Sequence, residues 1–172
     1  MLGYKDENDK LYGVTGMAVS LVVMDGDEFL DCVDVDAEPH NMVSLTDDYY
    51  FAGNPEVSAR VVWNTLLKHF NLAASMAIAN VVCRSLMISR TEPSEEQRTC
   101  LRNLVVEDGL ESCSLERDEA ENLFAKRYSY FIRVFSHPAV RQVADDFAHT
   151  LGEHRRMSRL EVLDALRALA ML

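Results

Sequence analysis

Two acidic residues and a histidine recur at four-residue spacing near the C-terminal end of this 172-residue chain. Asp145, His149 and Glu153 would share one face of a helix, because residues four apart lie one turn above another. A row of carboxylate, imidazole and carboxylate can bind a metal ion or transfer protons. No HExxH motif accompanies it in the sequence, and we expect Gly152 to end the helix beneath Glu153. The row therefore supports a metal-dependent hydrolase only as an alternative function, and a solvent-facing polar stripe is the simpler interpretation.

A second group of candidate residues is an acidic segment in the first third of the chain. Its members are Asp25, Asp27, Glu28, Asp31, Asp34, Asp36 and Glu38. The spacing from Asp34 onward begins like a calcium-binding loop, but Pro39 stands where such a loop needs glycine. Leu45 stands where the loop needs a bidentate glutamate. We therefore expect no metal or other cofactor here, and interpret the segment as an acidic strand surface that is either solvated or docked against a basic partner.

The entire net charge of −11 is carried by the first third of the sequence. Residues 1–56 hold 13 acidic and 2 basic residues, whereas residues 57–172 hold 15 of each. An acidic chain is unsuited to binding the nucleic-acid backbone or an anionic membrane directly. Carboxylates spaced like phosphates would instead suit a DNA-mimicking inhibitor of a nucleic-acid-binding protein, which we keep as a second alternative.

The one concentrated basic segment of the sequence is residues 154–159. It contains Arg155, Arg156 and Arg159, which we expect to pair with the acidic segment within one chain or across a homodimer, or else to be solvated. The candidate interaction surface comprises Asp25, Asp27, Asp31, Asp34, Asp36, Arg155, Arg156 and Arg159.

Signatures of other functions are absent from the sequence. It contains no GxSxG, GxxxxGK[ST] or GxGxxG motif. The four cysteines, at positions 32, 83, 100 and 113, form no CxxC motif, and we expect free, mostly buried thiols in a reducing cytosol. The N-terminus lacks the pattern of a secretory signal, and the apolar stretch 72–88 contains Arg84, so we expect a buried helix in a cytoplasmic protein.

The elements that must position these residues fall into two groups. Residues 1–15 resemble a loose arm, and residues 16–52 an acidic β-meander. Its first strand would be residues 16–24, where Met17, Val19, Leu21 and Val23 alternate, followed by a hairpin at Asp25-Gly26. The second strand would be residues 29–36, with a bulge suggested by imperfect alternation, and the third would lie within residues 42–51. Tyr49 and Tyr50, at the end of that third strand, are expected at the rim of a cleft or an interface, as is Tyr130.

Residues 54–172 read as helices. The predicted spans begin at Asn54-Pro55-Glu56, at Leu72 after a break at Asn71, at the Ser94 capping box, at Leu115, at Ser136-His137-Pro138 and at the Ser158 capping box. The third span is expected to end at Asp108-Gly109 and the last to run from Arg159 to Met171. Phe124, Tyr128, Phe131 and Phe135 follow helical spacing, which predicts a core stripe.

Strands followed by helices favour the α+β class. We predict a single domain, residues 1–172, in which a small N-terminal antiparallel β-meander of two or three strands packs on a C-terminal bundle of about five to six helices. The stretch 72–126 is similar in texture to TerB-like tellurite-resistance helical domains. The place of their acidic metal-binding pattern reads Ser89-Arg90-Thr91-Glu92 here, so the resemblance transfers no site residue.

The function predicted from the sequence is that of a non-catalytic module. We expect it to bind a protein partner or a second copy of itself through the acidic β-surface, without contacting nucleic acid or membrane directly.

Overall fold

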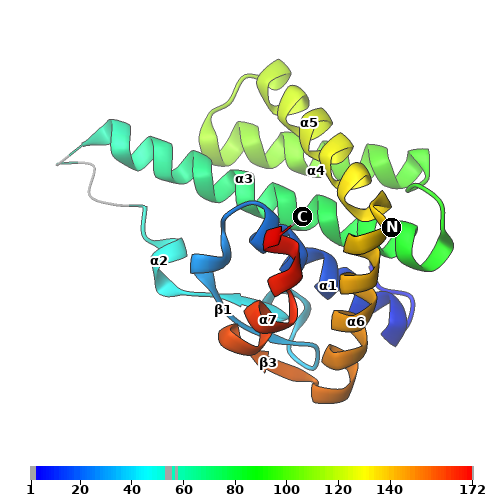
Figure 1. The fold of residues 1–172 in the computed structure, drawn as a ribbon. Helices are drawn as coiled ribbons and strands as arrows, with labels where there is room; N and C mark the ends of the chain where they lie inside the picture. The colour runs from blue at the N-terminus through cyan, green and yellow to red at the C-terminus, as the bar shows by residue number, and fades with distance from the viewer. Residues whose placement is uncertain (1–2, 53–55, 57, 172) are drawn as a thin grey trace.

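The computed structural model describes residues 3–52, 56 and 58–171 (Figure 1). Its α-helices are α1 (Glu7–Val23), α2 (Asp47–Tyr50), α3 (Ala59–Arg84), α4 (Glu95–Cys113), α5 (Arg117–Ser136), α6 (Pro138–His154) and α7 (Arg159–Ala165). Its strands are β1 (Leu30–Asp34), β2 (Val43–Leu45) and β3 (Arg156–Ser158). The shorter helical turns are η1 (Asp27–Phe29), η2 (Pro39–Asn41), η3 (Ser85–Ser89, a π-turn) and η4 (Arg167–Met171). The predicted α+β class, with a small antiparallel sheet and a set of helices, is confirmed.

The long helix α3 runs through the middle of the molecule (Figure 1). Helices α4 and α5 lie on one side of it, and α1, the sheet, α6 and α7 lie on the other. By length and composition alone, Ala59–Ser89 is the one stretch among the described helices that could cross a membrane, but 56% of its most apolar window is buried inside the fold. Neighbours on both sides of α3 explain why its C-terminal half is apolar nearly all round.

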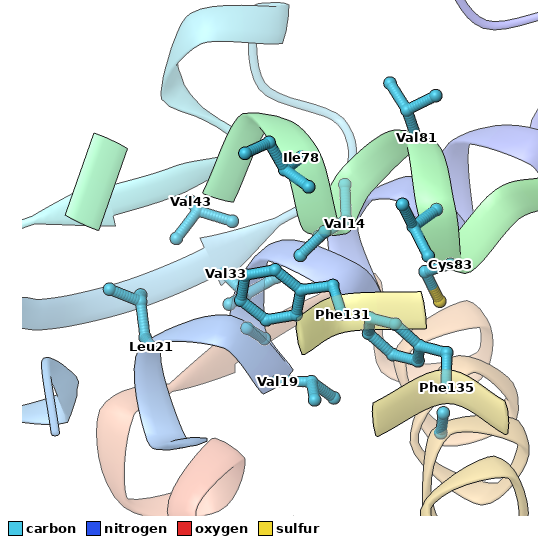
Figure 2. Packing of buried hydrophobic residues seen from close by; sticks show 14 of the residues in the cluster. Val14, Val19, Leu21, Val33, Val43, Ile78, Val81, Cys83, Phe131 and Phe135 are labelled. Carbon is cyan, nitrogen blue, oxygen red and sulfur yellow. The ribbon is translucent and has the colours of Figure 1, made fainter. Parts of the chain in front are cut away.

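The core lies where α1, α3, α5 and the sheet meet. Figure 2 shows Phe131 and Phe135 of α5 among Val14 and Val19 of α1 and Ile78 of α3. The four residues of the predicted aromatic stripe are all buried, as is Cys83, so these core predictions are confirmed. Packing of this kind stabilises the fold by roughly 1.5–3 kcal/mol for each large apolar side chain taken out of water.

Residues 16–23, predicted as the first strand, are helical. Helix α1 begins at Glu7, where the Asp6 side chain accepts a hydrogen bond from the Asp9 backbone, so the predicted loose arm is wrong for residues 7–15. Val14, Ala18, Val19 and Leu21 are all fully buried. A helix buried on several sides has apolar residues at both odd and even positions, and a period of two can be found in it by chance.

The Asp25-Gly26 pair ends helix α1 and does not form the predicted hairpin. Asp25 adopts a left-handed backbone conformation with φ of 53°. Its N–H donates to the Val22 carbonyl at 3.3 Å, and the Gly26 N–H donates to the Leu21 carbonyl at 2.7 Å. These are the two bonds of a Schellman motif, so the turn signal marked a helix C-terminus.

The sheet has the order β2-β1-β3, and its strands are antiparallel. The register of β1 against β2 shifts between Leu30 and Cys32, which confirms the predicted irregularity. Within residues 42–51 only Val43–Leu45 is a strand, and the next residues form the one-turn helix α2. The third strand is instead contributed by the basic segment, as β3.

The helical boundaries differ from the predictions at several places. Asn71 does not divide this region into two helices. Helix α3 is continuous through it, and the Asn71 side-chain amide donates to the Leu67 carbonyl one turn earlier. Helix α4 passes through Gly109 to Cys113, and Phe70 approaches the α-carbon of Gly109 so closely that a Cβ there would lie 2.9 Å from the ring. Helix α7 ends at Ala165 and the chain continues as η4. Both capping boxes, at Ser94 and Ser158, are confirmed, while Asn54 and Pro55 lie outside the described residues.

Candidate interaction surface

The predicted pairing of the basic and acidic segments is present within one chain. Arg155, directly before β3, donates to both carboxylate oxygens of Asp36 and also to Glu7 at the start of α1. The hydrogen bond from Arg155 lowers the pKa of Asp36, and the two carboxylates raise the pKa of Arg155. Arg155 therefore links the chain after β1, the start of α1 and the start of β3.

The remaining members of the predicted surface are only partly brought together. The β1–β3 register places Asp34 opposite Arg156, with 4.0 Å between carboxylate and guanidinium. Asp31 is exposed on β1 and Asp27 is half-buried in η1. Asp25 lies at the end of α1, away from these ion pairs, where it lines a groove formed with α5, α6 and η4. Arg159 is half-buried, and its Nε has no hydrogen-bond partner among the described residues.

These ion pairs bear on the DNA-mimic alternative. Such an inhibitor needs an open row of carboxylates along one face. Two carboxylates of the segment, those of Asp34 and Asp36, face arginines of their own chain. The acidic strand therefore offers little support for phosphate mimicry.

The carboxylate–imidazole row on α6 has two different ends: Asp145 is hydrogen-bonded to α1, whereas His149 and Glu153 are exposed to solvent. Asp145 accepts a 2.7 Å hydrogen bond from the Tyr12 hydroxyl of α1, and burial together with this bond raises the pKa of Tyr12 to about 12. His149 and Glu153 are exposed and 3.7 Å apart. The helix continues through Gly152 to His154, contrary to the prediction. In the part of the chain that the structure describes, no three His, Cys, Asp or Glu side chains are grouped so as to hold a metal ion.

A further groove lies between α1, β2, α2 and α3. Its volume is about 270 Å³. We call it the docking groove; it is lined by Met17, Pro39, His40, Val43, Leu45, Tyr49, Tyr50, Ala73, Met76 and Ala77. The expectation that Tyr49 and Tyr50 border a cleft is confirmed. Apolar, methionine-containing linings of this kind adapt to the shapes of apolar ligands.

One wall of the docking groove is fixed by aromatic contacts. The Tyr49 hydroxyl donates to the His69 carbonyl at 3.0 Å, and its ring stacks on the His69 ring with 4.7 Å between centroids. Phe29 meets both rings edge-on. Burial raises the pKa of Tyr49 to about 12. Helix α2 is thereby held on α3 despite its single turn.

Next to this fixed wall, large apolar side chains face solvent. Tyr50 is 73% exposed and Phe51 is 69% exposed. Trp63 and Leu66 of α3 are also exposed, at 47% and 39%. The N-terminal half of α3 extends past the rest of the molecule, which explains its exposure (Figure 1). We call Phe51, Trp63 and Leu66 the apolar extension.

Helical spacing relates the apolar extension to the docking groove. Leu66, Ala73 and Met76 are separated by seven and three residues, so they share one face of α3. Trp63 precedes Leu66 by three residues and lies close to the same face. Trp63 and Leu66 therefore lie on the side of α3 that lines the groove, and apolar surface gathered on one side of a helix marks sites of association.

The charges beside the docking groove are mostly acidic. Asp47 and Asp48 of α2 are exposed and directly precede the two tyrosines, and Glu38 is exposed before η2. Lys68 of α3 forms an ion pair with Glu28, with 2.7 Å between the ammonium and the carboxylate. The groove is thus an apolar surface with a negative border.

Comparisons with known proteins give no family for this chain: no family model, curated protein or solved structure matches it. The site is therefore defined by its own geometry. The signal available in the sequence was the run Tyr49-Tyr50-Phe51, because three consecutive aromatic residues cannot all be buried by a one-turn helix.

Proposed function

We propose that this chain is a non-catalytic protein-interaction module that binds an apolar segment flanked by basic residues. The observation that carries the proposal is the docking groove together with the apolar extension. The proposal keeps the interaction function predicted from the sequence, but assigns the contact to the apolar groove instead of the acidic strand surface.

The residue types of the groove suit association. Tyr, Trp, Phe and Met are enriched at protein interfaces, and the rigid rings of Tyr and Trp supply contact area at a small cost in side-chain entropy. Tyr50, Phe51 and Trp63 leave most or nearly half of their surface in water in the free chain. Covering them would remove that apolar surface from water at roughly 25 cal/mol per Å².

The negative border favours a basic partner over a second copy of the chain. Two copies joined groove to groove would bring Asp47 and Asp48 of each copy near those of the other, and such like-charge contacts cost several kcal/mol at an interface (order of magnitude). Lysine or arginine beside the apolar anchors of a partner would instead be attracted. A homodimer formed through this surface is the competing outcome of the tests below.

Trp63 provides a direct test, because it is the one tryptophan in the sequence. We would titrate the protein with a helical peptide carrying leucines at i, i+3, i+4 and i+7 and lysines on its flanks. The expected result is a saturable blue shift of Trp63 emission that weakens as salt is added. The control peptide has glutamate in place of each lysine and is expected to leave the emission unchanged.

Variants connect this response to the groove. The pair of substitutions Tyr50→Ser and Phe51→Ser should weaken peptide binding by about tenfold or more, as expected for removal of interface anchors. Leu160→Ser is the matched control, because Leu160 of α7 is 78% exposed and does not line the groove. Equal responses to both peptides, or equal affinity of both variants, would overturn the proposal. A concentration-dependent dimer that Tyr50→Ser abolishes would assign the surface to self-association.

A further inference from the structure

We propose that a second groove of this chain binds a small monocarboxylate with an apolar body. The groove lies where the end of α1, the C-terminal half of α5, the start of α6 and η4 meet, and its volume is about 450 Å³. It shares no lining residue with the docking groove. The inference is therefore independent of the proposed function.

The walls of this second groove are apolar. Val22 and Val23 come from α1, Val134 from α5, Val140 from α6 and Leu169 from η4. The Tyr130 hydroxyl lies 3.4 Å from the Val23 carbonyl, which places the Tyr130 ring across the junction of α1 and α5. Sites for small molecules have this character, with volumes of about 300–1,000 Å³ and a few polar groups among apolar side chains.

The polar groups of the second groove are mainly cationic or hydrogen-bond donors. Arg133, in the last turn of α5, forms no ion pair or side-chain hydrogen bond with any described residue. His137, directly before α6, has no side-chain hydrogen bond to the first turn of that helix. An available guanidinium next to valine side chains can receive a carboxylate with two parallel hydrogen bonds.

Charge complementarity decides the class of ligand. Among the described residues that line the groove, Asp25 is the one acidic side chain, against Arg133 and His137. Asp25 follows the C-terminal end of α1, whereas Arg133 and His137 lie at the junction of α5 and α6. We therefore assign the carboxylate of the ligand to Arg133 and its apolar body to the valines.

Octanoate is a suitable probe. Titration of the full chain with octanoate should shift backbone amide resonances of residues 22–25, 130–137, 139, 140 and 169 in ¹H–¹⁵N spectra, with a common saturation curve. Octylamine and octan-1-ol have the same apolar chain without the carboxylate, and both are expected to bind at least about tenfold more weakly.

Two arginines of α5 supply matched variants. Arg133→Gln should weaken octanoate binding by about tenfold, whereas Arg117→Gln, at the exposed start of the same helix, should leave it unchanged. Among the described residues, no ion pair or side-chain hydrogen bond depends on Arg133 or Arg117. Both variants are therefore expected to fold. Equal octanoate affinity of the two variants, octan-1-ol binding as tight as octanoate binding, or no saturable shift in the native chain would each overturn the proposal.

Discussion

The guanidinium of Arg84 on α3 donates to both carboxylate oxygens of Asp9 on α1, at 2.7 and 2.5 Å. Both side chains are buried, and the Lys5 backbone N–H also donates to Asp9 at 2.9 Å. The Tyr4 ring covers the guanidinium, with 4.9 Å between the Arg84 Cζ atom and the ring centroid. A bidentate pair of this kind fixes the N-terminal end of α1 on the C-terminal end of α3.

Removing one partner of this pair should destabilise the chain strongly. Asp9→Asn leaves a buried guanidinium without its counter-charge, and we expect a loss of about 3–5 kcal/mol in the free energy of unfolding. Urea denaturation followed by circular dichroism measures it. The double variant Asp9→Leu with Arg84→Met should recover part of the loss, because no unpaired charge then remains buried. A stability of Asp9→Asn within about 1 kcal/mol of the native chain would contradict the assignment.

Alanine is expected to have different effects at Gly16, where α1 closely approaches α3, and at Gly152 of α6. A Cβ at Gly16 would lie 2.4 Å from the Ala79 carbonyl oxygen, so Gly16→Ala must push the two helices apart. We expect it to cost about 1–3 kcal/mol or more. A Cβ at Gly152 meets only the Leu11 side chain, at 3.3 Å, and the higher helix propensity of alanine should offset that contact, giving a change of at most about 1 kcal/mol. Thermal unfolding of both variants distinguishes these outcomes, and equal melting temperatures would show that the helices do not touch at Gly16.

Acid should loosen the wall of the docking groove through His69. Burial, with a smaller contribution from the Lys68 charge, lowers the pKa of His69 below its ordinary value. The folded chain therefore favours neutral His69, and this contribution to stability is complete above about pH 6.5 and is lost as the pH falls through the lowered pKa. We expect the melting temperature to fall as the pH decreases below about 6.5.

The matched variants for this test are His69→Gln and His40→Gln. His69→Gln should flatten the pH dependence, since the titrating group is removed. His40 is exposed, and its replacement should leave the pH dependence as it is. If the slope survives in His69→Gln, another group causes it.

The elements that the sequence predicted well are those whose signals are local. The Ser94 and Ser158 capping boxes need only four consecutive residues, and the row from Phe124 to Phe135 has a single buried face. Helix α1 was missed because its burial comes from α3 and α6, which lie far away in the sequence. Asp25-Gly26 has the same composition whether it closes a hairpin or a Schellman motif, and only the preceding helix decides between them.

The candidate surface was only partly predictable, because most of it depends on contacts between residues far apart in the sequence. Opposite charge suggested that the basic segment 154–159 pairs with the acidic segment, and in the structure Arg155 of the basic segment pairs with Asp36. The docking groove needs Met17, Val43 and Met76 from three separate elements to meet. No local spacing specifies that meeting, so only the aromatic run at Tyr49 pointed toward it.

The position of β3 in the sheet has a consequence for how the chain is made. Arg156 contacts Cys32 of the central strand across 124 residues of sequence, so β1 leaves the ribosome long before its second neighbour does. Until then β1 can pair only with β2, and its other edge offers unpaired backbone groups to any strand that reaches it. Nascent copies synthesised close together are exposed to mispairing at that edge, and a chain interrupted before residue 156 would keep the edge open permanently.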